Sequence, residues 1–284
     1  MTKITEVVAN LDVIANRTVL LLVAVTLYLH CLPCGAQVQT SNTPDVAVAQ
    51  IFLDVPDRNR TSEFEQGLIK HIAWLKANHE VWTWLTWEVL TGKDSGKYIV
   101  GSFGHKWEDF DSHEAFNRTA SVSFKQSVGP ALSSSSCTFY VLRTDLSLSA
   151  EPSVPSKFEQ LNIFDVRPEG AREFSQSIRK MNAALKQTNF VSESFLSPNS
   201  AGGHSRWYFM TNGGQGPQYV LATDRNSYSD FNPVEASLDD VMEQVYGKDQ
   251  GDSIMANVRK TFVHVYSELV RFRPDLSYRP AAQP

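Results

Sequence analysis

The stretch Arg143–Ser147 reads RTDLS, and the stretch Arg273–Ser277, close to the end of the chain, reads RPDLS. Two nearly identical pentapeptides so far apart indicate that the chain of 284 residues contains two copies of one unit. Each copy would then end at this motif. If so, other landmarks should recur in the same order within both copies.

Two longer alignments support the duplication. WEVLTGKDSGKYIVGSFGHKWEDFD (Trp87–Asp111) aligns with WYFMTNGGQGPQYVLATDRNSYSDFN (Trp207–Asn232) with a single inserted residue. Further upstream, QIFLDV (Gln50–Val55) aligns with LNIFDV (Leu161–Val166). The order of the landmarks is conserved between the copies, so a repeated domain is indicated rather than a solenoid of short repeats.

Each copy predicts the same order of elements. A short apolar strand is followed by a helix, two strands joined by a Gly-rich hairpin, a second helix and a last strand. The first helix has an apolar stripe in both copies, formed by Phe64, Leu68, His71 and Leu75 and by Phe174, Ile178, Met181 and Leu185. Ser62 and Glu65 predict a capping box at its start in copy one. The order β-α-β-β-α-β predicts an α+β protein built from two ferredoxin-like units.

The predicted domain boundaries follow from the repeat. Copy one covers residues 45–147, a linker rich in Ser and Pro covers 148–157, and copy two covers 158–277. Helices cover only one face of the sheet in such a unit, and an open apolar face needs a partner. We therefore expect the two copies to form a pseudo-dimer within one chain. Whether this pseudo-dimer associates further stays open.

A short motif near the second helix of each copy resembles a known superfamily. KWEDF (Lys106–Phe110) and SYSDF (Ser227–Phe231) each combine an aromatic residue, an acidic residue and Phe after a strand hairpin. This pattern resembles the dimeric α+β barrel superfamily, which includes the antibiotic biosynthesis monooxygenase-like proteins. The resemblance covers most of residues 45–277 and implies an intramolecular dimeric α+β barrel. It also implies a ligand cavity between sheet and helices or inside the barrel.

The resemblance supplies only part of a catalytic pattern. In cofactor-free monooxygenases and haem-degrading relatives of this superfamily, an Asn on an early strand, a Trp and a His often gather at the cavity. Copy two has Asn162 on its first strand, but Tyr228 stands where copy one has Trp107, and His113 follows Trp107 in copy one. Since neither copy holds the full set, a buried amide bonded to the backbone is the alternative for Asn162.

The candidate ligand-binding residues are mostly aromatic. Trp82 and Trp84 share one face of a predicted strand, and Trp87 points to the other face. Both core packing and the wall of an apolar pocket fit these indoles. A Gly- and Ser-rich insertion in copy two could close a cavity mouth with His204 and Arg206, or could be an inert surface loop. The full set of candidates is Trp82, Trp84, Trp107, Asn162, His204, Arg206, Trp207 and Tyr228.

No metal or other cofactor is expected. GHKWEDFDSHEAF (Gly104–Phe116) is rich in His and carboxylates, which are metal-ligand types. The equivalent stretch of copy two has no His, so a solvated turn and helix start is the better interpretation. His71, within an apolar helical stripe, is expected to be structural rather than catalytic.

The N-terminal segment has the layout of a secretory signal peptide. Lys3 and Arg17 flank a polar lead-in, and the apolar run Thr18–Leu29 is too short to span a bilayer. Small residues follow, and cleavage is predicted after Ala36, so that residues 1–36 are removed and no stable membrane anchor remains. A retained anchor is the alternative.

Cleavage would also determine which cysteines remain in the mature chain. It would remove Cys31 and Cys34, leaving Cys137 as the single cysteine of the mature chain. Export without an internal disulfide favours a bacterial periplasmic or extracellular protein.

The composition narrows the possible functions. A net charge of −5 without a cluster of Lys and Arg argues against a nucleic-acid partner. Three functions remain open: an exported barrel that binds a small apolar molecule, a cofactor-free monooxygenase-like enzyme, and an envelope module that docks a protein partner.

Overall fold

The computed structural model describes residues 46–150, 152, 154–188, 205–232 and 237–280, all within the unit Asp45–Pro284. Copy one contains β1 (Val48–Pro56), α2 (Thr61–Ala77), β2 (Leu85–Val89), β3 (Tyr98–His105), α3 (Trp107–Ser127) and β4 (Leu132–Leu142). Copy two contains β5 (Phe158–Val166), α4 (Ala171–Gln187), β6 (Ser205–Asn212), β7 (Gln218–Arg225), α5 (Leu238–Tyr246), α6 (Lys248–Thr261) and β8 (Phe262–Phe272). The predicted signal segment and His204 lie outside the described residues.

The strands form one closed antiparallel barrel in the order β1-β3-β2-β8-β5-β7-β6-β4. Each copy contributes four adjacent strands, and the copies join where β2 pairs with β8 and where β4 pairs with β6. Trp87 lies opposite Phe272 at the first junction, and Tyr140 lies opposite Met210 at the second. The predicted α+β barrel made from two tandem ferredoxin-like units is confirmed. Closure leaves no unpaired sheet edge between the copies.

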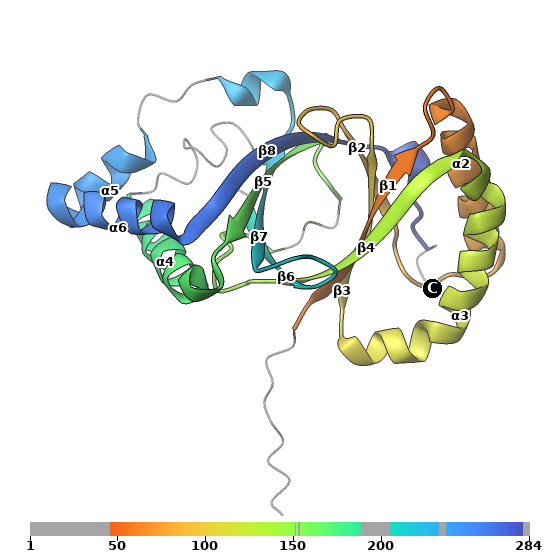
Figure 1. The fold of residues 1–284 in the computed structure, drawn as a ribbon, viewed down its shortest axis with the longest axis horizontal. Helices are drawn as coiled ribbons and strands as arrows, with labels where there is room; N and C mark the ends of the chain where they lie inside the picture. The colour runs from red at the N-terminus through yellow and green to blue at the C-terminus, as the bar shows by residue number, and fades with distance from the viewer. Residues whose placement is uncertain (1–45, 151, 153, 189–204, 233–236, 281–284) are drawn as a thin grey trace, which may run out of the picture. The chain divides into compact units, whose positions relative to one another are not determined.

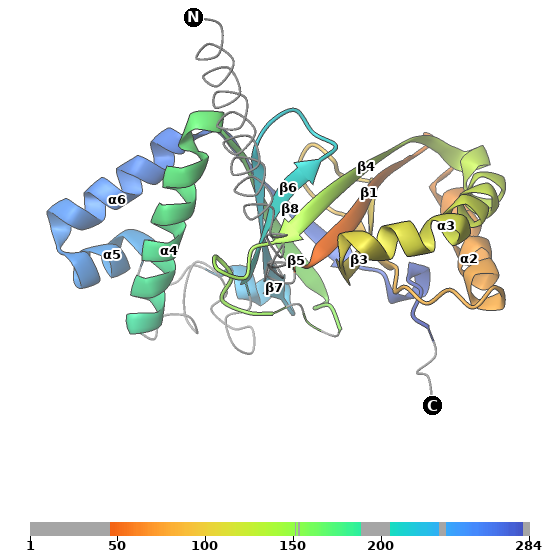
Figure 2. The same cartoon turned by 90° about the horizontal axis from the view of Figure 1, so that it is seen from below.

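The helices lie outside the barrel in two groups. α2 and α3 flank the strands of copy one, and α4, α5 and α6 flank those of copy two, as Figures 1 and 2 show from two directions. The sequence did not predict α6. It follows α5 after Gly247, whose φ of 76° is a conformation that favours glycine and redirects the chain. None of the helices in the described part of the chain is long and apolar enough to cross a membrane.

Each copy has a core between its sheet and its helices, but the two cores differ in size. Copy two holds one continuous cluster that includes Phe174, Ile178, Trp207 and Met242. Copy one holds a smaller cluster around Phe64. A third cluster of Leu85, Trp87, Val89 and Val270 lies on the inner face of the barrel. The apolar residues at spacings of three and four on α2 and α4 thus meet the sheets as the sequence predicts.

Strand pairing corrects the alignment of the copies by one residue. Trp87 lies opposite Ile99 in copy one, and the residue opposite the equivalent Val220 in copy two is Tyr208, not Trp207. Trp207 therefore faces the helices, whereas Trp87 faces the barrel interior. A shift of one residue reverses the face of every side chain in a strand.

The first strands show the same shift. Ile51 pairs with Thr138, and its equivalent Leu161 pairs with Glu268, so Leu161 matches Ile51 rather than Gln50. Asp54 consequently occupies the position that Phe164 occupies in copy two.

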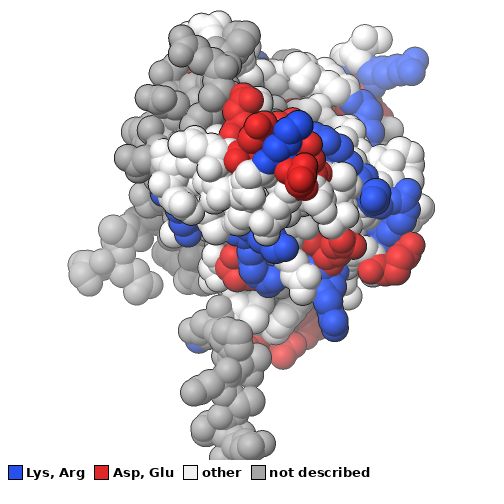
Figure 3. All heavy atoms as spheres, turned by 90° about the vertical axis from the view of Figure 1, so that its left-hand side faces the viewer, with Lys and Arg blue, Asp and Glu red and all other residues white. Residues whose placement is uncertain are grey.

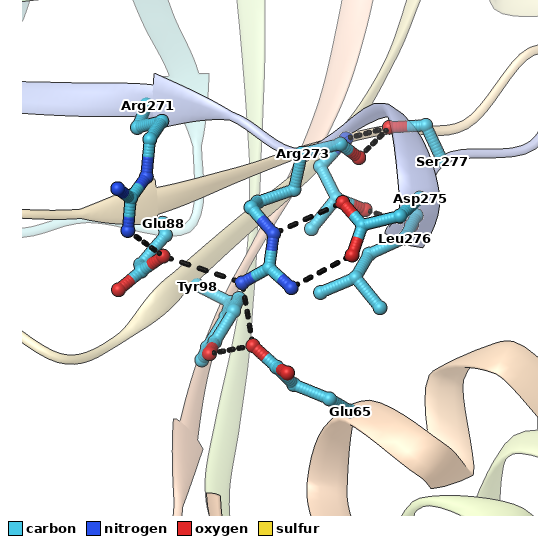
Figure 4. A network of polar contacts seen from close by, with 9 residues as sticks. Glu65, Glu88, Tyr98, Arg271, Arg273, Asp275, Leu276 and Ser277 are labelled. Atoms are coloured by element: carbon cyan, nitrogen blue, oxygen red, sulfur yellow. Dashed lines mark hydrogen bonds and ion pairs between the residues drawn. The ribbon is translucent and has the colours of Figure 1, made fainter. Parts of the chain in front are cut away.

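The RPDLS exit of copy two packs into copy one. Leu276 is buried in the copy-one core, and Arg273 bonds to Glu65 on α2 at 2.5 Å and to Glu88 on β2 at 3.3 Å (Figure 4). The Thr86 backbone N–H donates to Ser277 Oγ at 2.9 Å.

The RTDLS exit of copy one packs into copy two in the same way. Leu146 is buried in the copy-two core, and Arg179 on α4 bonds to Asp145 at 2.5 Å. The Trp207 N–H donates to Ser147 Oγ at 2.9 Å. Besides the local pairs Arg143–Asp145 and Arg273–Asp275, each exit therefore contacts the other copy.

The capping-box prediction for α2 is also wrong. α2 begins at Thr61 after Arg60, and the Glu65 carboxylate accepts from Tyr98 and Arg273 instead of from the helix N-terminus. Hydrogen bonds from Arg273, the largest cause, and from Tyr98 hold the pKa of Glu65 below its usual range. Glu65 therefore serves the contact between the copies, as Figure 4 shows.

The helical side of copy two carries charges of both signs. Arg259 pairs with Asp239 and Lys248 pairs with Asp252. Figure 3 shows basic and acidic side chains interspersed on this face. Such exposed pairs contribute little to stability.

Candidate functional site: the barrel cavity

The barrel encloses a cavity of about 270 Å³ that both copies line. Side chains that alternate along the strands point inward, so every second residue reaches the cavity. Its apolar lining consists of Ile51, Leu53, Trp87, Ile99 and Phe103 from copy one and Leu161, Ile163, Val220, Ala222 and Val270 from copy two. This volume lies at the small end of ligand pockets and fits a small molecule.

Tyrosines and an amide add polar groups to one side of the cavity. The Tyr140 hydroxyl donates to Gln218 Oε1 at 2.8 Å, and Gln218 Nε2 donates to Asp165 Oδ1 at 2.9 Å. Burial raises the pKa of Tyr140, so its hydroxyl keeps its proton at neutral pH. Trp87 adds an indole Nε1 that finds no hydrogen-bond partner among the described residues.

The hairpin turn between β2 and β3 closes over one mouth of the cavity. Its Lys93 Nζ lies 4.0 Å from the centre of the Tyr266 ring, and Asp94 lies beside Glu268. All four residues line the cavity. A second, more polar cavity of about 440 Å³ shares Lys93, Gln218 and Tyr266 with the first. The two cavities therefore adjoin at this mouth.

Glu268 is a buried carboxyl group in the lining of the cavity. Only 4% of its surface is exposed, and burial together with the neighbouring Asp94 charge raises its pKa to about 7. A carboxyl group with this pKa is only partly ionised at neutral pH, whereas an ordinary Glu is fully ionised.

A buried ionic triad occupies another part of the barrel interior. Arg206 bonds to both oxygens of Asp224 at 3.0 and 3.1 Å and lies 3.3 Å from Glu159. All three are buried, and Glu159 lines the cavity. The prediction that Arg206 closes a cavity mouth from a surface loop is wrong, because Arg206 lies on β6 inside the barrel.

The structure groups the predicted indoles of copy one outside the barrel cavity. Trp82 lies 6.2 Å from Trp84, and Phe110 bridges Trp82 to Trp107 at 5.1 and 5.8 Å between ring centres. None of these three indoles lines either cavity described above. Trp107 is 42% exposed, at the first residue of α3.

Trp82 belongs to a stacked cluster of aromatic rings. Its ring lies between those of His105 at 3.8 Å and His113 at 4.1 Å. The Glu80 carboxylate accepts a hydrogen bond from the backbone N–H of Trp82 at 2.7 Å and lies 3.1 Å from His113 Nε2. Ser102 Oγ lies 2.6 Å from His105 Nε2, and burial lowers the pKa of His105. Because its polar atoms are paired and its rings are in contact, the cluster fits a structural role.

Asn162, Trp207 and Tyr228, three candidates of copy two that the structure describes, do not gather at the cavity. Asn162 points away from it, since its neighbours Leu161 and Ile163 point inward. Trp207 is buried in the copy-two core, and Tyr228 is 64% exposed with its ring on Phe158 at 4.8 Å. The structure thus does not unite the Asn, Trp and His types in one place.

His71, the histidine expected to be structural, lies on α2. His71 is half-buried, its Nδ1 lies 3.1 Å from Ser123 Oγ, and burial lowers its pKa to about 4. That environment fits the structural role expected for it. Among the described residues, no group of three or more His, Cys, Asp or Glu is placed to hold a metal ion.

Sequence reasoning missed Lys93, Asp94, Tyr266 and Glu268, the residues at the cavity mouth. In the sequence, Lys93 and Asp94 are recognisable only as part of a hairpin. Tyr266 and Glu268 are recognisable only as part of a last strand. Strand alternation counted back from the RPDLS exit could have placed Tyr266 and Glu268 on one face. It could not have shown which hairpin covers them.

Comparison with known proteins supports the fold described above. No protein-family model matches the sequence, and no curated protein does. A solved anthrone oxidase-like protein matches with a TM-score of 0.50 at 15% identity, over 84% of this chain and 95% of that one. The chain has the dimeric α+β barrel fold.

Two further solved α+β barrel structures resemble this one less. A protein of Lactobacillus acidophilus NCFM, provisionally classed as a monooxygenase, matches with a TM-score of 0.49 at 10% identity, over 83% of this chain and 97% of that one. A mutant chlorite dismutase of Candidatus Nitrospira defluvii matches with a TM-score of 0.48 at 10% identity, over 81% and 92%. At such identities, the shared fold does not transfer an activity.

Proposed function

We propose that this α+β barrel protein binds a small, largely apolar molecule inside the barrel. The observation that carries the proposal is the cavity of about 270 Å³, which is lined by apolar side chains of both copies and by a few polar groups near one mouth. Apolar walls supply affinity, and a small number of polar groups orients the ligand. The unpartnered Trp87 Nε1 would gain a hydrogen bond from a ligand acceptor that reaches it.

A cavity-filling variant tests this proposal. Val220→Phe places a larger side chain in the cavity, whereas Val265→Phe makes the same change on an exposed position of β8. Native mass spectrometry of the purified protein detects a retained ligand, and NMR titration with 2-tetralone, an apolar bicyclic ketone, measures binding. We expect Val220→Phe to weaken binding by about tenfold or more, equivalent to about 1.4 kcal/mol, and Val265→Phe to leave it unchanged. Equal binding by both variants would place the ligand elsewhere.

A second candidate function is oxidation of the bound molecule by dioxygen without a cofactor. The name of the anthrone oxidase-like structure and the Glu268 carboxyl in the cavity favour it. A methylene carbon and one O₂ give a carbonyl and one water, so the reaction needs no external reductant. Oxygen uptake measured with an electrode, in the presence of 2-tetralone, tests this candidate; no uptake above that of the ketone alone would exclude it for this compound.

Export to the periplasm or the extracellular space is part of the proposal. It rests on the signal-like layout of residues 1–36, which predicts a mature chain beginning at Gln37. N-terminal sequencing of the protein secreted by a bacterial host checks this point, and an intact Met1 on soluble protein would contradict it. A partner-docking role in the envelope would instead leave the cavity without a ligand.

A further inference from the structure

Two carboxyl groups from different copies meet at the mouth of the cavity. Glu268 lies on β8 of copy two, and Asp94 lies in the β2–β3 turn of copy one. The backbone N–H and the carboxyl group of Asp94 both lie close enough to the Glu268 carboxyl to influence its pKa. Glu268 Oε1 is buried and has no hydrogen-bond partner among the described residues. The pair therefore exists only in the closed pseudo-dimer.

The turn is held firmly against Glu268. The Leu90 N–H donates to Leu269 O at 2.8 Å, and the Leu269 N–H donates to Thr91 Oγ1 at 2.9 Å. Gly92 has a φ of +87°, and a Cβ at this position would lie 2.8 Å from Glu268 Cγ. Only glycine combines this backbone conformation with such a close approach.

Charged groups of both signs surround Glu268 and Asp94. Asp94 also pairs with Lys97 at 2.5 Å, and the Lys93 ammonium stands over Tyr266 at the same mouth. Glu159, the other carboxylate of the cavity, is already paired with Arg206. On the neighbouring strand β5, Leu161 lies opposite Glu268 and adds no charge. Burial and, after it, the Asp94 charge raise the pKa of Glu268, whereas the Lys93 ammonium lowers it.

We infer that Glu268 is the proton acceptor for a weak carbon or oxygen acid bound in the cavity, such as an enolisable ketone or a phenol. This inference rests on the proposed binding function. The bond between ligand and hydrogen breaks, the proton binds to the Glu268 carboxylate, and the electron pair stays on the ligand as an enolate or phenolate. The Lys93 ammonium stabilises the resulting negative oxygen, and return of the proton restores the ligand. The step needs no oxidant or reductant.

Deuterium exchange into 2-tetralone provides the test. In D₂O, NMR follows the loss of the α-hydrogen signals of the ketone with the purified full chain present. Because the carboxylate is the active form, we expect the exchange rate to rise as pH increases through about 7 and then to level off. Glu268→Gln keeps the shape of the side chain and should lower the enzyme-dependent rate by about 100-fold or more.

Two further variants separate a base from a structural role. Asp94→Asn removes the neighbouring charge and should move the inflection of the pH profile to lower pH, because Asp94 raises the pKa of Glu268. Asp54→Asn is the matched control, since Asp54 is another buried carboxyl with a raised pKa but does not line the cavity. Its exchange rate should equal that of the unmodified protein. Thermal melts confirm that each variant is folded.

The outcomes distinguish the two proposals. If 2-tetralone binds but exchanges no faster than in buffer, or if Glu268→Gln exchanges at the original rate, the base assignment is overturned and cavity binding stands. If 2-tetralone does not bind, both proposals are overturned for apolar ketones of this size. Binding, accelerated exchange and a profile that shifts in Asp94→Asn together support the assignment.

Discussion

The two copies place polar groups on opposite faces of the same sheet. Between sheet and helices, copy two packs Phe164 and Trp207 into a continuous core, whereas copy one has Asp54 and Thr86 at those positions. Inside the barrel the relation is reversed, because Leu85 of copy one is matched by the buried Arg206 of copy two. The copies thus share the same strand pairing, but copy one has polar side chains on the face toward its helices, whereas copy two has them on the face toward the barrel interior.

The largest expected effect comes from separating the copies. Cutting the chain between residues 150 and 157 should leave copy one without Leu276 and copy two without Leu146, in addition to opening both junctions of the barrel. Each half expressed alone is expected to aggregate or remain unfolded, and co-expressed halves should reassemble. Size-exclusion chromatography and circular dichroism check this. Two stable, monomeric halves would show that the exchanged exits are dispensable.

The buried triad is expected to give the next largest effect. Arg206→Leu introduces the copy-one residue but removes the Arg206 ion pairs of the buried Asp224 and Glu159, and should cost about 3–5 kcal/mol of unfolding free energy. The triple variant Arg206→Leu, Asp224→Phe and Glu159→Ala installs the full copy-one set. It should be neutral or more stable by about 1–4 kcal/mol, because none of the three positions then carries a buried charge.

Urea denaturation of the single and triple variants measures this difference. Leu85→Ala in copy one is the control for simple loss of apolar contacts, with an expected cost of about 2–5 kcal/mol. A triple variant as unstable as the single one would mean that the barrel of copy two cannot accept the apolar set.

The smallest effect is expected for Asp54. Burial raises its pKa from 3.8 to about 6, which means that ionisation is less favourable in the folded protein than in the unfolded chain. Stability should therefore fall as pH rises from about 4 to about 6, by about 3 kcal/mol in total. Asp54→Asn removes this loss and should raise the melting temperature at pH 8 but not at pH 4. An equal change in melting temperature at both pH values would contradict a buried, ionised Asp54.

The sequence alone determined the duplication and the order of elements. Repeated motifs, and apolar residues that recur every two or every three to four positions, are local features of a sequence. The motifs RTDLS and RPDLS and the apolar stripes on α2 and α4 could therefore be recognised without coordinates. The same reasoning predicted a pseudo-dimer of the two copies, and the resemblance of KWEDF and SYSDF to the dimeric α+β barrel superfamily implied the barrel. Even the opposite directions of Trp84 and Trp87 followed from strand alternation.

Only the tertiary structure decided which side chains share a site. The sequence alignment of the two copies is shifted by one residue in these strands, so that it matches Trp87 to Trp207 instead of Tyr208 and Asp54 to Asp165 instead of Phe164. Such a shift assigns each side chain to the wrong face of the sheet. Likewise, Glu268 and Asp94 are far apart in sequence and meet because β2 of one copy pairs with β8 of the other. Closure of a barrel is a long-range event, and the environment it creates around a carboxyl group cannot be read from the neighbours of that residue in sequence.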